Sequence, residues 1–307
     1  MSTNIENIIF SGGGHNILIM FGAISHLKKL GYIDFTKVKS IDATSAGALL
    51  AFTFMLNADD DDITKYLIER PWEKVFDVTP EVIFQTFKNK GLFNIRVIEQ
   101  IMDPIMKSSE FERNITFQEL YEKNGIDFNV YVSELNKLEM VRLSHETTPN
   151  EQVLEAIYKS CAIPPLFRPV IEGDCCYFDG GVFANYPLHC FLERMKENQE
   201  EVDMKKIFGV KLISEMANND KINDDSNITD YTFCIIKKLV QHIVIHREHN
   251  VSIPNELLIY SKGMSFETLK QSIMSSDERK YLLNEGKRYA SVYHKYKMKE
   301  LQLDNTV

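Results

Sequence analysis

The first 60 residues contain two short apolar segments, each followed by a turn of small residues and then by a helical pattern. Residues 7–10 (NIIF) precede Ser-Gly-Gly-Gly, and residues 38–42 (VKSID) precede Ala-Thr-Ser-Ala-Gly. Helical periodicity follows over residues 17–31, and an apolar run follows over residues 46–56. Strands that alternate with helices in this way form a mostly parallel sheet covered by helices. The pattern therefore predicts an α/β fold.

The rest of the chain continues with both kinds of element. Further strands are expected over residues 127–135, 140–144, 175–183 and 206–213. Further helices are expected over residues 57–67, 150–163, about 231–250 and about 265–300, with a polar loop over 214–230. The aromatic-rich stretch 71–118 is expected to be mostly helical, either as a cap or substrate wall or as ordinary core helices. No repeat or clear boundary divides the sequence, so a single domain over residues 1–307 is expected.

Composition excludes several classes of protein. A chain of 307 residues with 44% hydrophobic residues can bury a large core. Its net charge of -9 argues against a nucleic-acid partner and gives little attraction to anionic lipid. The five cysteines are odd in number and lack CxxC spacing, which is typical of reduced thiols. The N-terminus lacks the pattern of a signal peptide, and the longest apolar stretch is shorter than the roughly 20 residues of a spanning helix. We expect a cytoplasmic or peripheral membrane protein.

Ser45 lies between small residues where the second apolar strand gives way to a helix. An abrupt strand-to-helix turn strains the backbone at its central residue, and small neighbours avoid clashes there. Ala43 and Gly47 occupy the flanking positions of the nucleophile elbow, G-x-S-x-G, with alanine in place of the first glycine. The helix N-terminus also favours developing negative charge. Taken alone, Ser45 fits either an ordinary turn or a nucleophile.

A second turn of small residues follows the first strand. Gly12, Gly13 and Gly14 precede His15 and allow the backbone to approach a ligand closely. The turn could be a flexible connection, a phosphate loop or an oxyanion hole. The dinucleotide fingerprint needs a glycine where Ile17 stands, and the Gly-Lys-Ser/Thr of a P-loop is absent from the sequence. An oxyanion hole needs only a short row of N–H donors.

Asp179 ends an apolar strand and is followed by Gly180 and Gly181. A carboxylate at this position can accept the proton of the Ser45 hydroxyl, although Asp-Gly is also common in ordinary turns. The segment SCAIPPLFRPV precedes this strand over residues 160–170, and Asn-Tyr-Pro follows it over residues 185–187.

The order of these segments resembles the patatin-like phospholipase family. The family pattern is a glycine-rich loop, G-x-S-x-G, a helix that ends in an A-x-P-x-x-F-x-P-like segment, and D-G-[GA] with a nearby N-x-P. The resemblance covers about residues 5–215. It leaves a C-terminal helical part, about residues 228–300, without a matching motif.

The resemblance implies a three-layer α/β/α fold with a mostly parallel central sheet and additional C-terminal helices. It implies a serine hydrolase of lipids, of the phospholipase A or lysophospholipase type, with a Ser-Asp dyad. Ser45 would attack an ester carbonyl, Asp179 would take the proton, and an acyl-serine would form. The oxyanion would be held by the backbone of Gly12–His15. Phospholipid or another lipid ester is the implied substrate, with peripheral membrane contact and without a cofactor, a metal or calcium.

The sequence departs from the family pattern in the glycine-rich loop. Asn16 stands where the family has a basic residue, and Ile17 stands where it has the last glycine. These departures motivate a second hypothesis, a catalytically weak or inactive patatin-fold module that binds lipid or a protein partner.

Three histidines and an acidic run are less favoured as functional sites. A Ser-His-Asp triad or a metal site would use His242, His246 and His249, but their spacing is that of a helix and no HExxH frame surrounds them. The acidic run at residues 59–62 lacks the spaced ligands of a calcium loop and suits the start of a helix.

Overall fold

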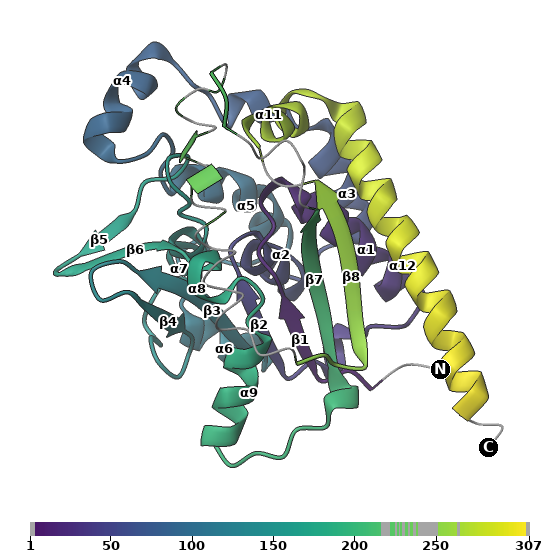
Figure 1. The fold of residues 1–307 in the computed structure, drawn as a ribbon. Helices are drawn as coiled ribbons and strands as arrows, with labels where there is room; N and C mark the ends of the chain where they lie inside the picture. The colour runs from purple at the N-terminus through teal and green to yellow at the C-terminus, as the bar shows by residue number, and fades with distance from the viewer. Residues whose placement is uncertain are drawn as a thin grey trace.

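The computed structural model describes residues 4–215, scattered positions between 222 and 238, and residues 251–262 and 265–304. A single sheet forms the centre of the molecule (Figure 1). Its strands are β1 (Asn7–Phe10), β2 (Ser40–Thr44), β3 (Asp127–Glu134), β4 (Glu139–Leu143), β5 (Val170–Glu172), β6 (Cys175–Asp179), β7 (Ile207–Glu215) and β8 (Asn255–Lys262).

The sheet is mixed, and its central strands are parallel. The strand order is β5-β6-β3-β2-β1-β7-β8, and β4 pairs with β3 outside this path. Strands β3, β2, β1, β7 and β8 are parallel neighbours, whereas β4, β5 and β6 pair antiparallel. The mostly parallel α/β sheet expected from the sequence is therefore confirmed.

Helices connect and cover the strands. They are α1 (Ile17–Lys29), α2 (Ala46–Met55), α3 (Asp60–Glu69), α4 (Pro80–Asn89), α5 (Arg96–Ser108), α6 (Phe117–Asn124), α7 (Val153–Ser160), α8 (Gly181–Ala184), α9 (Leu188–Glu197), α11 (Phe266–Met274) and α12 (Ser276–Asp304). Short 3-10 turns include η1 (Gly14–Asn16) and η3 (Trp72–Lys74).

Both faces of the sheet are buried, which makes three layers. On β1, Ile8 and Phe10 point into the main core, which includes residues of α1, α2 and α12. Ile9 points to the other face, into a smaller core with Phe191 and Met195 of α9. Because alternate side chains of a strand point to opposite faces, a strand covered on both sides is apolar throughout. This accounts for the unbroken apolar run that the sequence has at β1.

Helix α12 contacts α1 closely enough for their backbones to touch. A Cβ atom on Gly22 would lie 2.2 Å from the carbonyl oxygen of Leu283, and one on Gly286 would lie 2.0 Å from that of Ile19. The C-terminal helix is therefore part of the packed core and runs along the outside of α1 (Figure 1).

The structure differs from the sequence predictions in two elements. Strand β8 pairs in parallel with β7 and was not predicted, because its apolar residues form only a short run. The helix expected over 265–300 is two helices, since α11 ends at Met274 and α12 begins at Ser276. The helix expected over 231–250 lies mainly outside the described residues. No helix among the residues described is long and apolar enough to cross a membrane.

Candidate active site

Ser45 occupies a strained turn between β2 and α2. Its backbone angles are φ 54° and ψ -127°, which a residue with a side chain rarely adopts. Such strain persists only where the surrounding structure enforces it, and it is common at functional sites. The packing also explains why Gly47 follows Ser45, because a Cβ on Gly47 would lie 2.4 Å from the carbonyl oxygen of Ser11. Helix α2 can therefore start against the end of β1 only with glycine at this position.

The hydroxyl of Ser45 donates a hydrogen bond to Asp179. The distance from Ser45 Oγ to Asp179 Oδ2 is 2.7 Å. The other carboxylate oxygen, Oδ1, accepts a hydrogen bond of 2.7 Å from the backbone N–H of Gly181. Both side chains are buried, with Ser45 9% and Asp179 7% exposed. The two residues are thus held in the geometry of a nucleophile and its base.

Burial determines the acidity of this carboxyl group. It raises the pKa of Asp179 to about 6, and the hydrogen bonds from Ser45 and Gly181 oppose this rise. A carboxylate in water is too weak a base to activate a hydroxyl, so a raised pKa suits a general base that works near neutral pH. Cys161 lies against the same pair, and its pKa is raised by burial and by Asp179, so it stays a neutral thiol.

The register of β3 explains why residues 134 positions apart meet. Strand β4 pairs with residues 130–134 of β3 along one edge. Strand β2 must therefore use the other edge, and it ends there with Thr44 opposite Tyr131. Strand β6 runs the opposite way along that same edge and ends with Asp179 opposite Val132. The carboxyl ends of β2 and β6 consequently meet end to end.

Ser160, at the end of α7, forms hydrogen bonds to the backbone at the end of β2, in β3 and after β6. Its Oγ accepts a hydrogen bond of 2.7 Å from the backbone N–H of Ser45 and donates one of 2.6 Å to the carbonyl oxygen of Tyr131. Its own carbonyl oxygen accepts the N–H of Gly180 at 3.3 Å. This role of Ser160 was not predicted from the sequence. In the sequence, Ser160 is marked only by its place at the start of SCAIPPLFRPV, and this segment is recognised by its prolines.

The glycine-rich loop passes directly beside Ser45. A Cβ on Gly12 would lie 3.3 Å from the Cβ of Ser45 and 2.7 Å from Oδ1 of Asn185. The N–H of Gly12 donates to the carbonyl oxygen of Asn185 at 2.9 Å. This bond uses the Gly12 donor, so the donors left to face a ligand come from Gly13 onward, where η1 begins. The Asn-Tyr-Pro segment is thereby attached to the loop as well as to the strand that carries Asp179.

Asn16 and His15 give this loop no positive charge. The side-chain amide of Asn16 is buried and donates to the carbonyl oxygen of Gly13 at 3.1 Å, which fixes the turn from within. Burial lowers the pKa of His15 to about 4, so the imidazole is neutral at physiological pH. Its Nδ1 has no hydrogen-bond partner within the described part of the chain. Stabilisation of an anion here would come from backbone N–H groups and helix ends.

Gly180 and Gly181 allow the chain to turn sharply after Asp179. A Cβ on Gly180 would lie 2.0 Å from the carbonyl oxygen of Tyr131, and one on Gly181 would lie 2.8 Å from Oδ1 of Asp179. Ala43 is fully buried in β2. All ten residues singled out from the sequence thus lie in or next to the three turns that meet at the ends of β1, β2 and β6: Gly12, Gly13, Gly14, His15, Ala43, Ser45, Gly47, Asp179, Gly180 and Gly181.

The acidic run and the three histidines lie away from these turns or outside the described residues. Asp59 accepts hydrogen bonds from the N–H groups of Asp61 and Asp62 at the start of α3, as expected for a helix cap. Within the ranges that the structure describes, no group of three or more His, Cys, Asp or Glu residues could hold a metal ion. The triad histidines at 242, 246 and 249 fall outside the described residues.

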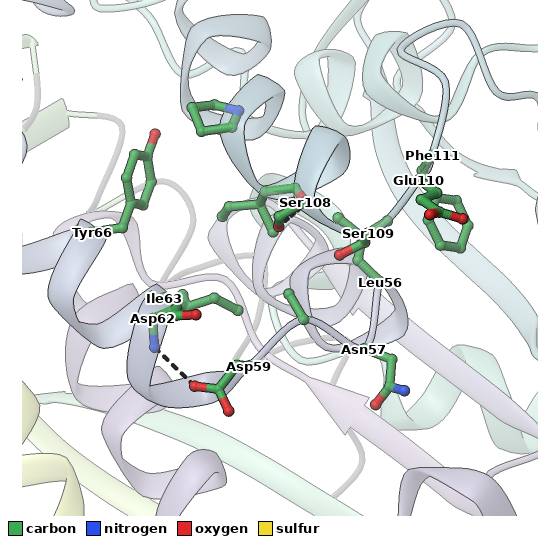
Figure 2. Close-up of a pocket in the computed structure, with 13 residues that line it drawn as sticks. Leu56, Asn57, Asp59, Asp62, Ile63, Tyr66, Ser108, Ser109, Glu110 and Phe111 are labelled. Carbon is green, nitrogen blue, oxygen red and sulfur yellow. Dashed lines mark hydrogen bonds between the residues drawn. The ribbon is translucent and has the colours of Figure 1, made fainter.

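Figure 2 shows the residues that line a cavity of about 680 Å³. It opens beyond the C-terminal end of α2, and Leu56, Tyr66 and Phe111 are among the residues that line it. Neither Ser45 nor Asp179 contributes to its wall. Since α2 begins directly after Ser45 and has 10 residues, about 15 Å of helix separates the cavity from the Ser45–Asp179 pair.

Comparison with known proteins gives a match to one family. The model of the family described as patatin-like phospholipase matches residues 8–192. "Probable lipid hydrolase 463L" of Invertebrate iridescent virus 6 is 25% identical over 201 residues, which are 64% of this chain and 67% of that protein. "Triacylglycerol lipase ptl3" of Schizosaccharomyces pombe is 28% identical over 177 residues, which are 55% of this chain and 35% of that protein.

Solved structures give a more distant likeness. VipD from Legionella pneumophila matches with a TM-score of 0.48 and 19% identity, over 92% of this chain and 67% of that one. The type III effector ExoU matches with a TM-score of 0.47 and 12% identity, over 95% of this chain and 53% of that one.

Proposed function

The chain belongs to the patatin-like phospholipase family, and on this premise we propose that it hydrolyses carboxylic ester bonds of lipids with Ser45 as nucleophile and Asp179 as general base. The observation that carries the proposal is the 2.7 Å hydrogen bond between the two side chains. The strained backbone of Ser45 and the raised pKa of Asp179 add to it. Names of relatives such as lipid hydrolase and triacylglycerol lipase support a lipid ester as substrate.

In the first half of the reaction Ser45 is acylated. Its Oγ attacks the ester carbonyl carbon while its proton passes to Oδ2 of Asp179. The carbonyl oxygen becomes an oxyanion, which the backbone N–H groups of Gly13, Gly14 and His15, at the start of η1, would hold. When the tetrahedral intermediate collapses, the bond to the alcohol breaks and the leaving oxygen takes the proton from Asp179. An acyl-serine remains.

In the second half water releases the acid. Asp179, again ionised, takes a proton from a water molecule that attacks the acyl carbon. A second oxyanion forms and collapses, Ser45 leaves as the alcohol by recovering the proton, and a fatty acid is released. We propose that this cycle needs no metal ion, because the Ser45–Asp179 pair supplies both nucleophile and base. Turnover should therefore be unchanged by EDTA.

A second candidate is the weak or inactive module that binds lipid. It is favoured by one observation, the absence of a cation in the described glycine loop, where Asn16 is committed to Gly13 and His15 is neutral. Losing one donor from an oxyanion hole typically lowers the rate by about 10²–10³. The two candidates therefore differ in turnover and agree in fold.

Steady-state hydrolysis separates them. The substrates are 4-nitrophenyl butyrate, lysophosphatidylcholine, phosphatidylcholine and trioleoylglycerol, each assayed with the wild type and with Ser45→Ala. We expect the wild type to release acid from at least one substrate and the Ser45→Ala protein to release none. Equal background rates for two folded proteins on all four substrates would support the binding module and refute the enzyme.

A further inference from the structure

Helix α4 exposes its apolar side chains to solvent. Phe84 is 88% and Phe87 92% exposed, and Ile83 is 53% exposed. Residues three and four apart lie on the same face of a helix, so these three side chains form one apolar surface. No residue of α4 is buried. A contiguous apolar patch on a protein surface often marks a site that binds a partner or a membrane.

The helix projects from a closed base. Trp72 and Val75 before α4 pack with Phe93 and Val97 after it, in a small core of their own. The rings of Phe76 and Phe93 also meet edge to face, with centroids 5.5 Å apart. Figure 1 shows α4 at the periphery of the molecule, away from the central sheet. Phe84 and Phe87 are not part of this small core, which is packed without them.

The base of α4 is tied to the segment beside the dyad. The N–H groups of Leu92 and Phe93 donate to the carbonyl oxygens of Pro165 and Leu166, at 3.1 and 2.8 Å. This segment continues directly from Ala162, whose carbonyl oxygen accepts the N–H of Asp179 at 3.2 Å. The base of α4 is therefore connected through this segment to the backbone of Asp179.

We propose that α4 is the docking element of this protein on a zwitterionic phospholipid surface, into which Phe84 and Phe87 insert. This inference rests on the proposed function, since a lipid hydrolase must reach substrate that is held in such a surface. Two exposed cations, Lys88 and Lys90, follow the phenylalanines and match the phosphate oxygens of the headgroup layer. The net charge of -9 opposes adsorption to anionic membranes and favours a neutral one.

A protein partner fits this element less well. A helix of 10 residues is about 15 Å long and convex, and it offers far less than the roughly 800 Å² that each side of a stable interface buries. A bilayer, in contrast, closes around a protruding side chain without needing a matching groove.

Binding is measured by flotation of the Ser45→Ala protein with phosphatidylcholine vesicles, so that no substrate is consumed. Replacing both phenylalanines with serine (Phe84→Ser, Phe87→Ser) should lower the partition coefficient by about tenfold or more, because two large apolar groups are lost. The matched control replaces two other exposed apolar residues, Leu138 (63%) and Val292 (63%), with serine and should leave binding unchanged. Equal binding by the phenylalanine variant and the control would overturn the proposal.

Hydrolysis rates and the oligomeric state test the proposal further. On 4-nitrophenyl butyrate in solution, the phenylalanine variant with Ser45 intact should match the wild type, while on vesicles its rate should fall with its binding. A wild type that floats through α4 but hydrolyses none of the four ester substrates would refute the proposed function and leave the docking proposal standing. A wild-type dimer that the phenylalanine substitutions convert to a monomer, without vesicle binding, would assign α4 to self-association and overturn docking.

Discussion

At the scale of single residues, the arrangement depends on a hydroxyl that takes no part in the chemistry. Ser160 accepts the backbone N–H of Ser45 and donates to the carbonyl oxygen of Tyr131. The strained angles of Ser45 are therefore held by a hydrogen bond from outside the turn. We regard Ser160 as a positioning residue, because it contacts the backbone of Ser45, the proposed nucleophile.

Ser160→Ala should lower kcat for ester hydrolysis about 10- to 100-fold and leave KM nearly unchanged, because small displacements of a nucleophile reduce rate more than binding. The buried N–H of Ser45 also loses its acceptor, so the free energy of unfolding should fall by about 1–3 kcal/mol. Kinetics and urea unfolding measure the two effects.

The matched control is Ser144→Ala. Ser144 is equally buried, and its hydroxyl accepts the N–H groups of Glu146 and Thr147 in a loop that follows β4. That variant should lose stability without losing kcat. An equal loss of kcat in both variants would mean that Ser160 acts only through stability.

The pKa of Asp179 predicts the pH dependence of the reaction. A general base must be ionised, and burial raises the pKa of this carboxyl group to about 6. kcat/KM should therefore rise about tenfold per pH unit below 6 and level off above about 7. A pH–rate profile on a soluble ester measures this limb.

Asp42 could produce the same limb, because burial also raises its pKa to about 6. Asp42 faces the hydroxyl of Tyr131 and the guanidinium of Arg194, at 2.6 and 2.8 Å, and does not touch the dyad. The limb should persist in Asp42→Asn. If the limb disappears in Asp42→Asn, the titrating group is Asp42 and not Asp179.

The same carboxylate should make the fold less stable at neutral pH. The folded pKa of Asp179, about 6, lies above its ordinary value of 3.8, so protonation favours the folded state. That contribution is complete below about pH 4 and is lost as the pH rises through 6. Asp179→Asn avoids the buried charge, and its amide can still accept from Gly181 and donate to Ser45. The variant should be inactive yet more stable at pH 8, by on the order of 1–3 kcal/mol.

The gain in stability should shrink as the pH falls toward 4, where Asp179 in the wild type is protonated. Chemical unfolding of both proteins at pH 8 and pH 5 measures the difference. A variant that is less stable than the wild type at both values would show that the ionised carboxylate is stabilised by its hydrogen bonds more than burial destabilises it.

At the scale of helices and strands, α1 and α12 pack in direct backbone contact. Gly22 and Gly286 let the two backbones touch, since a Cβ on Gly286 would lie 2.0 Å from the carbonyl oxygen of Ile19. An alanine within a helix is ordinarily more stable than glycine, by roughly 0.5–1 kcal/mol. Here the steric effect should reverse the sign.

Gly286→Ala should lower the free energy of unfolding by about 1–3 kcal/mol, the usual range for an overpacked core. Lys287→Ala, at the next and exposed position of α12, is the control and should change stability by less than about 0.5 kcal/mol. Thermal and urea unfolding compare the three proteins. A Gly286→Ala protein that is more stable than the wild type would show that α12 is free to shift away from α1.

The elements that the sequence predicted best are those with local signals. Strand β1, the glycine loop, β2 and the turn at Ser45 follow from small residues placed between apolar runs, and the structure has them within one or two residues. Strand β8 owes its form to its pairing with β7 across a long stretch of sequence, and no local pattern reports such pairing. For the same reason, the sequence could not reveal that β2 and β6 share one edge of β3.

The candidate site was predictable in its residues and not in its contacts. Ser45, Asp179 and the glycines stand in recognisable motifs, so their positions could be named from the sequence. The hydroxyl of Ser160 and the bond between Asn16 and the carbonyl oxygen of Gly13 depend on side-chain directions that only the packed structure defines. The exposure of Phe84 and Phe87 could not be predicted either, because aromatic side chains in a helix are usually buried.

At the scale of the whole molecule, three turns converge at the carboxyl ends of the central strands. The glycine loop follows β1, the hydroxyl of Ser45 follows β2, and the carboxylate of Asp179 ends β6. Ligand sites of parallel α/β sheets lie at this edge because helix N-termini and loops gather there. The remaining layers hold these turns in place, and α4 extends from the segment beside them.

Covalent labelling with a fluorophosphonate, followed by intact mass and peptide mass spectrometry, tests whether Ser45 is a nucleophile activated by Asp179. The wild type should gain one adduct, on the peptide that contains Ser45, at a rate that rises through pH 6. Ser45→Ala should gain none, and Asp179→Asn should react at least 100-fold more slowly while remaining folded, in line with the loss of a general base, which is typically worth about 10²–10⁴. An adduct on another residue would show that Ser45 is not the nucleophile, and equal labelling rates for the wild type and Asp179→Asn would show that Asp179 does not activate it.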